Sequence, residues 1–197
     1  GLPLDEINRN HIKLSKKKYK SNFFIQQGVC DLNPDVDAIY RMYKKNINIK
    51  FKNIKINISS SITPFNSQNT TWHKSLLPLM YLPVTCTMRC TDIWRSLITL
   101  RILGINSLNM MFNGPTVFQK RNYHNLEKDF SDEVSMYMNN KKIYALLTKI
   151  KLKKGIKNFS TNLRNCYKIL IKNNFFKKKE IIFLNAWLKD CKKIELI

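Results

Sequence analysis

The chain has few of the residues from which several common sites are built. Its 197 residues include only five glycines and three histidines. None of the glycines forms a glycine-rich phosphate loop. His11, His73 and His124 lie far apart in the sequence, so they suggest no nucleophile, base and acid that act together. The sequence therefore indicates neither a glycine-rich nucleotide loop nor a histidine-based triad.

Cysteine pairs at metal-binding spacing and long apolar runs are also absent. The five cysteines include no C-x-x-C pair, and Cys86 and Cys90 have no second pair or nearby histidine that would complete a zinc site. We therefore predict no metal site in this chain and interpret most of the cysteines as buried small apolar residues. Charged residues and prolines interrupt the most apolar stretch, residues 76–111. No run reaches the roughly 20 apolar residues that span a bilayer.

Acidic residues are scarce as well, because 13 Asp and Glu face 35 Lys and Arg, which gives a formal net charge of +22. Such an excess ordinarily points to nucleic acid or an anionic membrane surface. Only seven of the basic residues are arginine, however, and the lysines occur with Asn, Ile, Phe and Tyr, which share A/T-rich codons. The lysine-rich segments 13–20, 149–157 and 175–180 lack the context of a nucleic-acid module. We interpret them as solvated surface and keep RNA binding as an alternative function.

The hydrophobic pattern predicts an α/β fold that is followed by helices. Strands are expected at 22–29, 46–57, 82–88 and 108–112, with a turn at Gly114-Pro115. Helices are expected near the C-terminus at 125–139, 141–154, 160–173 and 178–193. We therefore divide the chain into an α/β portion, residues 1–124, and a helical C-terminal segment, residues 125–197, packed on it.

Two further helices have clear predicted starts in the α/β portion. One is expected to have Asn33 as its N-cap and Pro34 at its first position. The other is expected to have Thr91 as its N-cap, Asp92 in its first turn and Gly104 at its end. A helix N-terminus at the end of a strand is where an α/β protein tends to hold a ligand.

An acidic pair, Asp35 and Asp37, has the D-x-D spacing of metal-dependent glycosyltransferases. In the first turn of a helix, residues two apart diverge by roughly 200° around the axis, so both carboxylates cannot easily close on one ion. We therefore interpret the two residues as acids that complement the positive end of the helix dipole.

A polar loop, TPFNSQNTTWH at residues 63–73, lies between aromatic residues. Its polar members are Asn66, Ser67, Gln68, Asn69, Thr70 and Thr71. Such residues can surround a sugar with hydrogen bonds, while Trp72 stacks on the sugar ring. The alternative is an ordinary loop in which Thr70 or Thr71 caps a helix that begins near Trp72.

Four ordered blocks of the sequence carry a resemblance to one family. The blocks are residues 21–42, 65–103, 114–134 and 183–190. They resemble the STELLO-type glycosyltransferases over about residues 1–190. The same blocks are similar, more distantly, to the UDP-arabinopyranose mutase or reversibly glycosylated polypeptide family.

The resemblance implies a GT-A-like fold, in which a nucleotide-sugar half built on a Rossmann-like sheet precedes an acceptor half. This chain would be the later, acceptor-side portion of a larger protein whose beginning is missing, and it would hold no cofactor itself. A divalent metal such as Mn would bind through the missing N-terminal half. The mutase family has a second acid where this chain has Thr91, and many GT-A enzymes have a metal-binding histidine in the region where it has Gln119.

The site residues follow from the same resemblance. Asp92 is the predicted catalytic residue, either as a general base or as an acceptor for a sugar hydroxyl. The predicted substrate-binding residues are Asn66, Ser67, Gln68, Asn69, Trp72, Trp94 and Arg95.

The implied partners are a nucleotide sugar and a glycan acceptor, and the implied location is the Golgi, in a membrane-anchored full-length protein. Because one of the two acids is replaced by Thr91, a scaffold that assembles other glycosyltransferases is the alternative function.

Overall fold

The computed structural model describes residues 23–44, 46–53, 56–58 and 63–194, with residues 56–58 described only by their backbone. The strands are β1 (Phe23–Leu32), β2 (Ile56–Ile58), β3 (Thr70–Trp72) and β4 (Asn109–Gln119). The α-helices are α1 (Ala38–Tyr43), α2 (Thr91–Ile105), α3 (Leu126–Lys149), α4 (Phe159–Lys172) and α5 (Glu180–Lys193). Two 3-10 helices, η2 (Lys74–Met80) and η3 (Ile156–Asn158), complete this part of the chain. The predicted α/β class is confirmed.

The four strands form one mixed sheet in the order β2-β4-β1-β3. The central strands β1 and β4 are parallel, whereas β2 and β3 pair antiparallel with β4 and β1 respectively. Leu32 lies opposite Gln119, so the carboxyl ends of the two central strands meet at one edge of the sheet. The segments that follow both strands therefore begin side by side.

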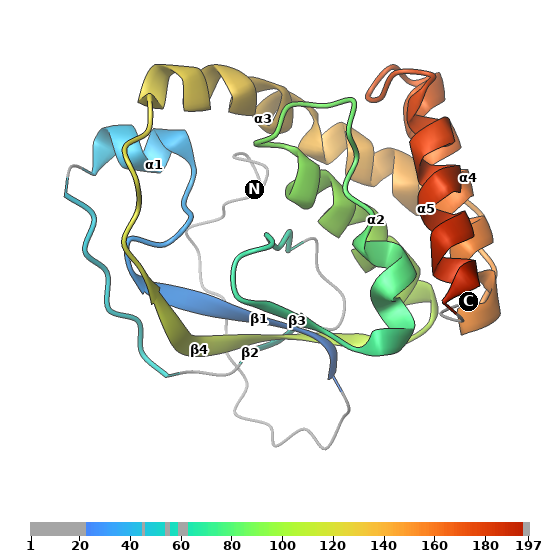
Figure 1. The fold of residues 1–197 in the computed structure, drawn as a ribbon, viewed down its shortest axis with the longest axis horizontal. Helices are drawn as coiled ribbons and strands as arrows, with labels where there is room; N and C mark the ends of the chain where they lie inside the picture. The colour runs from blue at the N-terminus through green and yellow to red at the C-terminus, as the bar shows by residue number, and fades with distance from the viewer. Residues whose placement is uncertain (1–22, 45, 54–55, 59–62, 195–197) are drawn as a thin grey trace.

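The helices lie together over the sheet, with α2 in the middle, α3 across it, and α4 and α5 paired at one end (Figure 1). Most of α2 is buried, including its polar residues Ser96 and Thr99. Ile25 and Met110 of the sheet and Leu163 of α4 belong to the same apolar core. None of the helices in the described part of the chain is long and apolar enough to cross a membrane.

The predicted strands at 22–29 and 108–112 are confirmed as β1 and β4, and both extend further. The predicted turn at Gly114-Pro115 is wrong, because these residues lie inside β4. The register explains how a proline is tolerated there: Gly28 pairs with Asn113, but Cys30 pairs with Val117. The extra residues of β4 bulge out of the ladder, where a residue without an N–H leaves no hydrogen bond unmade.

Two other predicted strands are largely wrong. Residues 82–88 are irregular, with bends and a turn, and the backbone N–H groups of Val84 and Thr85 bond to a buried carboxylate, Glu180, instead of to another strand. In the predicted strand 46–57, the described residues are in strand only at the start of β2, apart from one bridge between Ile49 and Leu32. Residues 45, 54–55 and 59–62 are outside the described part of the chain.

The predicted helices in the C-terminal part are present, with one correction. Segments 125–139 and 141–154 are joined in a single helix, α3, because Asn140 does not end it; the helix ends at Lys149, so the predicted end at residue 154 is wrong. The side chain of Asn140 is buried and accepts a hydrogen bond from Trp94 Nε1 at 2.9 Å, which stabilises this residue inside the helix. The helices at 160–173 and 178–193 are confirmed as α4 and α5.

The two predicted N-caps are wrong by one to four positions. Helix α1 begins at Ala38 with Asp37 as its N-cap, rather than after Asn33. Thr91 is the first residue of α2 rather than its cap, and its hydroxyl donates to Met88 O at 3.1 Å. The helix continues one residue beyond Gly104.

Candidate functional site

A pocket of about 100 Å³ lies beyond the carboxyl ends of β1 and β4, beside the N-terminus of α2. Its lining is Asp35, Val36, Asp37, Asn66, Met88, Arg89, Asp92, Ile93, Glu133 and Met136. We call it the Asp92 pocket. Residues from four separate segments meet here, and they include two of the predicted site residues, Asp92 and Asn66.

The carboxylate of Asp92 holds the polar loop in place. Its Oδ2 atom accepts a hydrogen bond from Ser67 N at 2.9 Å, and the side chain of Asn66 accepts one from Gln68 N at 3.1 Å. Within the described residues, Asp92 Oδ1 accepts no hydrogen bond. One oxygen of Asp92 is therefore structural, while the other has no partner in the part of the chain that the structure describes.

Gln68 ties the loop to the segment that follows β1 and to the last residue of β4. Its side-chain oxygen accepts from Asp35 N at 3.0 Å, and its amide nitrogen donates to Gln119 Oε1. Gln119, the residue in the region where GT-A enzymes place a metal-binding histidine, thus takes part in a bond within the protein. Among the described residues, no group of three His, Cys, Asp or Glu side chains is placed to hold a metal ion.

Asn69 lies on the sheet side of the loop, in the left-handed region with φ of 50°. Its side chain donates to Val29 O at 3.0 Å and accepts from Thr116 Oγ1 at 3.1 Å, and its backbone oxygen accepts from Gly28 N at 2.8 Å. The residue therefore joins the loop to β1 and β4. It does not line the Asp92 pocket.

We expect Gly28→Ala to destabilise the protein by about 1–3 kcal/mol, the usual cost of overpacking. A Cβ atom at Gly28 would lie 2.8 Å from Asn69 Cγ, too close for a carbon contact. Asn69→Gly removes the obstructing side chain and still allows the positive φ, so it is the matched second change. Urea unfolding of both single variants and the double variant should show that Gly28→Ala costs less in the Asn69→Gly background. An equal cost in both backgrounds would contradict the contact.

Behind the pocket, arginines and carboxylates pair across four segments. Arg121 lies 2.7 Å from Asp35, Arg89 lies 3.6 Å from the same carboxylate, and Arg89 Nε donates to Glu133 at 2.8 Å. Burial opposes the charge on Arg89, but its hydrogen bond with Glu133 and its attraction to Glu133 and Asp35 outweigh this and raise its pKa. Arg89 therefore stays charged.

Asp35 and Asp37 have separate roles in this arrangement. Asp37 Oδ1 accepts from Tyr40 N at 2.9 Å and so caps α1, whereas Asp35 pairs with Arg89 and Arg121. Both residues precede the helix, so their predicted position in its first turn is wrong. The interpretation of Asp37 as an acid at the positive end of α1 agrees with its position as N-cap.

Among the predicted substrate-binding residues only Asn66 lines the Asp92 pocket, and Trp72, Trp94 and Arg95 are among those that do not. Trp94 is 2% exposed, with its rings in the core against Phe175 and Phe176. Arg95 is 3% exposed, and its guanidinium carbon lies 5.0 Å from the centre of the Trp72 ring. Burial lowers the pKa of Arg95, although the charge of Asp92 opposes this. A sugar-binding role for these residues stays a prediction, and the pocket itself does not support it.

The position of Trp72 also tests the helix caps that the alternative interpretation of its loop predicts. Thr70 and Trp72 lie in β3, and the cap of the following helix, η2, is His73, whose Nδ1 accepts from Ser75 N at 3.3 Å. The predicted caps Thr70 and Thr71 are therefore wrong. The single proton of the Thr70 hydroxyl instead lies between two acceptors, Asn66 O at 2.8 Å and Gln27 Oε1 at 2.9 Å.

Glu133 is a pocket residue that the sequence analysis missed, although a signal was present. The buried residues of α3 include Glu133, Met136, Asn140, Ile143 and Leu147, at spacings of three and four. This helical period places Glu133 on the inward face, where an acid needs partners.

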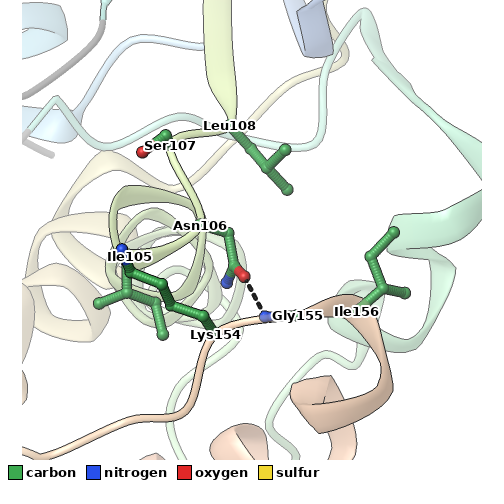
Figure 2. A pocket seen from close by; sticks show the side chains of 7 residues that line it. All are labelled: Ile105, Asn106, Ser107, Leu108, Lys154, Gly155 and Ile156. Carbon is green, nitrogen blue, oxygen red and sulfur yellow. Dashed lines mark hydrogen bonds between the residues drawn. The ribbon is translucent and has the colours of Figure 1, made fainter.

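A second hollow, of about 350 Å³, lies at the opposite end of β4 (Figure 2). Its lining is Ile105, Asn106, Ser107, Leu108, Lys154, Gly155 and Ile156. The side chain of Asn106 is already used, because it accepts from Gly155 N at 2.6 Å and donates to Ile102 O at 2.7 Å. Apolar side chains, the Ser107 hydroxyl and one lysine remain, so this hollow lacks the acids that the Asp92 pocket offers for chemistry.

The fold and the Asp92 pocket define an α/β protein whose candidate site lies at the carboxyl edge of its parallel strands. A family model described as STELLO glycosyltransferases matches residues 89–197, more than half of the chain. The chain belongs to the STELLO glycosyltransferase family, and its mixed α/β fold is that of a part of a glycosyltransferase domain. The resemblance expected from the sequence is confirmed, while the more distant kinship to the mutase family stays a prediction.

Two curated relatives are proteins of Arabidopsis thaliana. The chain is 26% identical to "Probable glycosyltransferase STELLO2" and 24% identical to "Probable glycosyltransferase STELLO1". Each match covers 96% of this chain and 25% of the relative. The chain thus spans about a quarter of the length of these relatives.

Proposed function

We propose that this chain supplies the acceptor-side part of a glycosyltransferase that uses a nucleotide sugar and acts on a glycan. Family membership supports the class of reaction, and the free oxygen of Asp92 in a pocket at the sheet edge carries the assignment of the site. In this proposal Asp92 Oδ1 accepts a hydrogen bond from the acceptor hydroxyl and takes its proton as general base.

The surroundings of Asp92 support this role. Its second oxygen is held by Ser67 N, so the carboxylate is oriented before a ligand arrives. Asn66 adds an amide that can bind a neighbouring hydroxyl. Thr91 cannot act as the second acid, since it is a buried threonine bonded to Met88 O. The proposal therefore rests on one base.

The size of the pocket indicates how much of the substrate this chain would bind. Pockets for whole small-molecule ligands measure roughly 300–1,000 Å³, whereas the Asp92 pocket measures about 100 Å³. It accommodates part of one sugar ring. We propose that the nucleotide, and a divalent metal such as Mn, bind to the part of the protein outside this chain.

Location and pathway are proposed from the family resemblance alone. We propose that the full-length protein resides in the Golgi, anchored in the membrane, and takes part in the synthesis of a glycan or polysaccharide. Co-fractionation of the tagged full-length protein with Golgi markers would be the expected result, and enrichment in another compartment would contradict it.

We expect Asp92→Asn to lower the rate of sugar transfer by the full-length protein about a hundredfold, at the lower end of the usual contribution of a general base. Asparagine can still accept from Ser67 N, so the loop should stay in place, and only the proton acceptor is lost. The measurement is transfer from each nucleotide sugar that the wild type uses.

Asp37→Asn is the matched control for this experiment. It makes the same chemical change in the same pocket, and asparagine is an equally good N-cap for α1. Its rate should remain within a few-fold of the wild type. Unchanged transfer by Asp92→Asn from every active donor would rule out the base role.

A scaffold for other glycosyltransferases is the second candidate function, favoured by the absence of a second acid at Thr91 and by the engagement of Gln119 with Gln68. For a scaffold, calorimetry on the full-length protein would show no binding of nucleotide sugars, while partner glycosyltransferases would still co-purify with it. Sugar-nucleotide binding together with transfer would exclude the scaffold as its sole function.

A further inference from the structure

Another pocket, of about 460 Å³, lies near the Asp92 pocket, where the segment 84–87 meets the loop between α4 and α5. Its lining is Val84, Thr85, Cys86, Thr87, Trp94, Ser135, Phe175, Lys177 and Lys179. We call it the lysine pocket. Figure 1 shows the loop between α4 and α5 close to the segment that precedes α2, above the end of α3. The lysine run of residues 175–180, which the proposed function does not use, forms one side of it.

Hydrogen bonds fasten the two sides of the lysine pocket together. Lys177 N donates to Thr85 Oγ1 at 3.1 Å. The fully buried carboxylate of Glu180 accepts from Thr85 N at 2.8 Å and from Val84 N at 3.1 Å. Because these bonds join backbone and side chains across the pocket, its shape is set before any ligand binds.

The charged side chains that line this pocket are both positive. Lys177 and Lys179 are exposed and have no ion-pair partner among the described residues, and no acidic side chain lines the pocket. Glu180, the adjacent acid, is buried with its oxygens bonded to the protein. Burial raises the pKa of the Cys86 thiol to about 12, so this residue is uncharged. The pocket therefore favours an anion.

The rest of the lining suits a sugar ring better than a bare anion. Trp94 is 2% exposed and lies at the deep side, with Phe175 beside it, so part of the surface is aromatic. The hydroxyls of Thr85, Thr87 and Ser135 add neutral hydrogen-bonding groups, although Thr87 already donates to Asp132 O at 2.6 Å and can only accept from a ligand. The volume lies within the usual range of roughly 300–1,000 Å³ for small-ligand pockets.

We propose that the lysine pocket binds an acidic sugar, a pyranose that carries a carboxylate, sulfate or phosphate group. The anionic group lies against the ammonium groups of Lys177 and Lys179, the ring covers the aromatic side, and the threonine and serine hydroxyls meet the sugar hydroxyls. This binding goes beyond the proposed function, because it does not require a catalytic Asp92. In a transferase it would select glycans that bear acidic residues.

Calorimetry on the full-length protein tests the proposal with four compounds: glucuronate, glucose 6-phosphate, glucose and inorganic phosphate. Both acidic sugars should bind, and Lys177→Gln/Lys179→Gln should weaken their binding about tenfold or more through loss of the charge-assisted bonds. The matched control is Lys168→Gln/Lys189→Gln, which removes two exposed lysines outside the pocket. This control should bind within about twofold of the wild type, since distant surface charges are screened by salt.

Three results would overturn the proposal. Equal loss in the control variant would show general attraction to a basic protein, and inorganic phosphate binding as tightly as glucose 6-phosphate would show an anion site without sugar recognition. Absence of binding by both acidic sugars would exclude the site altogether. Asp92→Asn should leave this binding unchanged, so failure of the proposed base and failure of the lysine pocket are distinguishable.

Discussion

Glu133→Ala is expected to destabilise the protein by about 3–5 kcal/mol, the range for removing one partner of a buried ion pair. Glu133 is 1% exposed and has three kinds of donor around it. Its carboxylate accepts from Arg89, from Ala38 N at 2.8 Å and from Tyr137 OH at 2.5 Å. In the alanine variant, the half-buried guanidinium of Arg89 would keep only its ion pair with Asp35. The N–H of Ala38, at the start of α1, would lose its acceptor.

The loss should be visible in two measurements. Urea unfolding followed by circular dichroism gives the change in free energy, and amide hydrogen exchange should speed up first in α1, whose N-terminal N–H is bonded by Glu133. Glu127→Ala is the control, because Glu127 is an exposed acid in the first turn of the same helix. It should cost at most about 1 kcal/mol, the contribution of an exposed charge to the helix dipole. Equal costs for the two variants would show that the buried network contributes nothing.

Glu180→Ala is expected to cost about 3 kcal/mol, because it leaves several buried donors unpaired at once. The side chain of Glu180 is fully buried at the start of α5. It accepts from Tyr81 OH at 2.5 Å and from Val84 N and Thr85 N. Burial, followed by the bond to Glu180, raises the pKa of Tyr81, so its hydroxyl remains a donor across the physiological range.

Glutamine tests the chemistry of this contact separately from its shape. Both oxygens of Glu180 accept from donors, so in Glu180→Gln the amide group would turn N–H toward N–H or O–H. We therefore expect Glu180→Gln to lose a large part of the same free energy. Asp190→Ala, on the exposed face of α5, removes only a surface pair with Lys193 and should cost under about 1 kcal/mol. Full stability of the glutamine variant would contradict the role of the carboxylate as an acceptor.

The same two acids connect stability with the pockets. Glu133 orients Arg89 beside Asp92, and Glu180 holds the segment 84–87 against Lys177. A loss of either acid should therefore change ligand binding as well as unfolding. Both residues occur in helices that were expected from the sequence, but apart from Tyr137 their partners are 44 to 99 positions away in the chain.

Single-sequence patterns predicted the helices of this protein better than its strands. In α4 and α5 the apolar residues repeat at spacings of three and four, and this period is set by the local backbone. The strand pattern at 82–88 is equally clear locally, yet none of the described strands pairs with it. A strand needs a distant partner for its hydrogen bonds, and the sequence does not show whether that partner is there.

The candidate site was also predictable only where it depends on local features of the sequence. Asp92 and Asn66 were identified as neighbours of a helix start and members of a polar loop, both of which are local features. Trp94 and Arg95 follow Asp92 in the sequence, but the helix rotates by about 100° per residue and carries both side chains into the core. Sequence adjacency in α2 therefore gave no measure of closeness in the pocket.

The sequence alone determined the α/β class, the family, the main helices and one acid at a helix start, because composition, period and ordered blocks are properties of the chain itself. Tertiary structure decided which oxygen of Asp92 is bonded to Ser67 N and which has no partner among the described residues. It also decided that Asp35 pairs with arginine while Asp37 caps α1. Lys177 and Lys179 lie in one pocket with Thr85 and Thr87 for the same reason. These contacts join residues that are far apart in the sequence. A buried charged side chain points toward its hydrogen-bond partners, and the tertiary fold, rather than local backbone preference, decides where those partners lie.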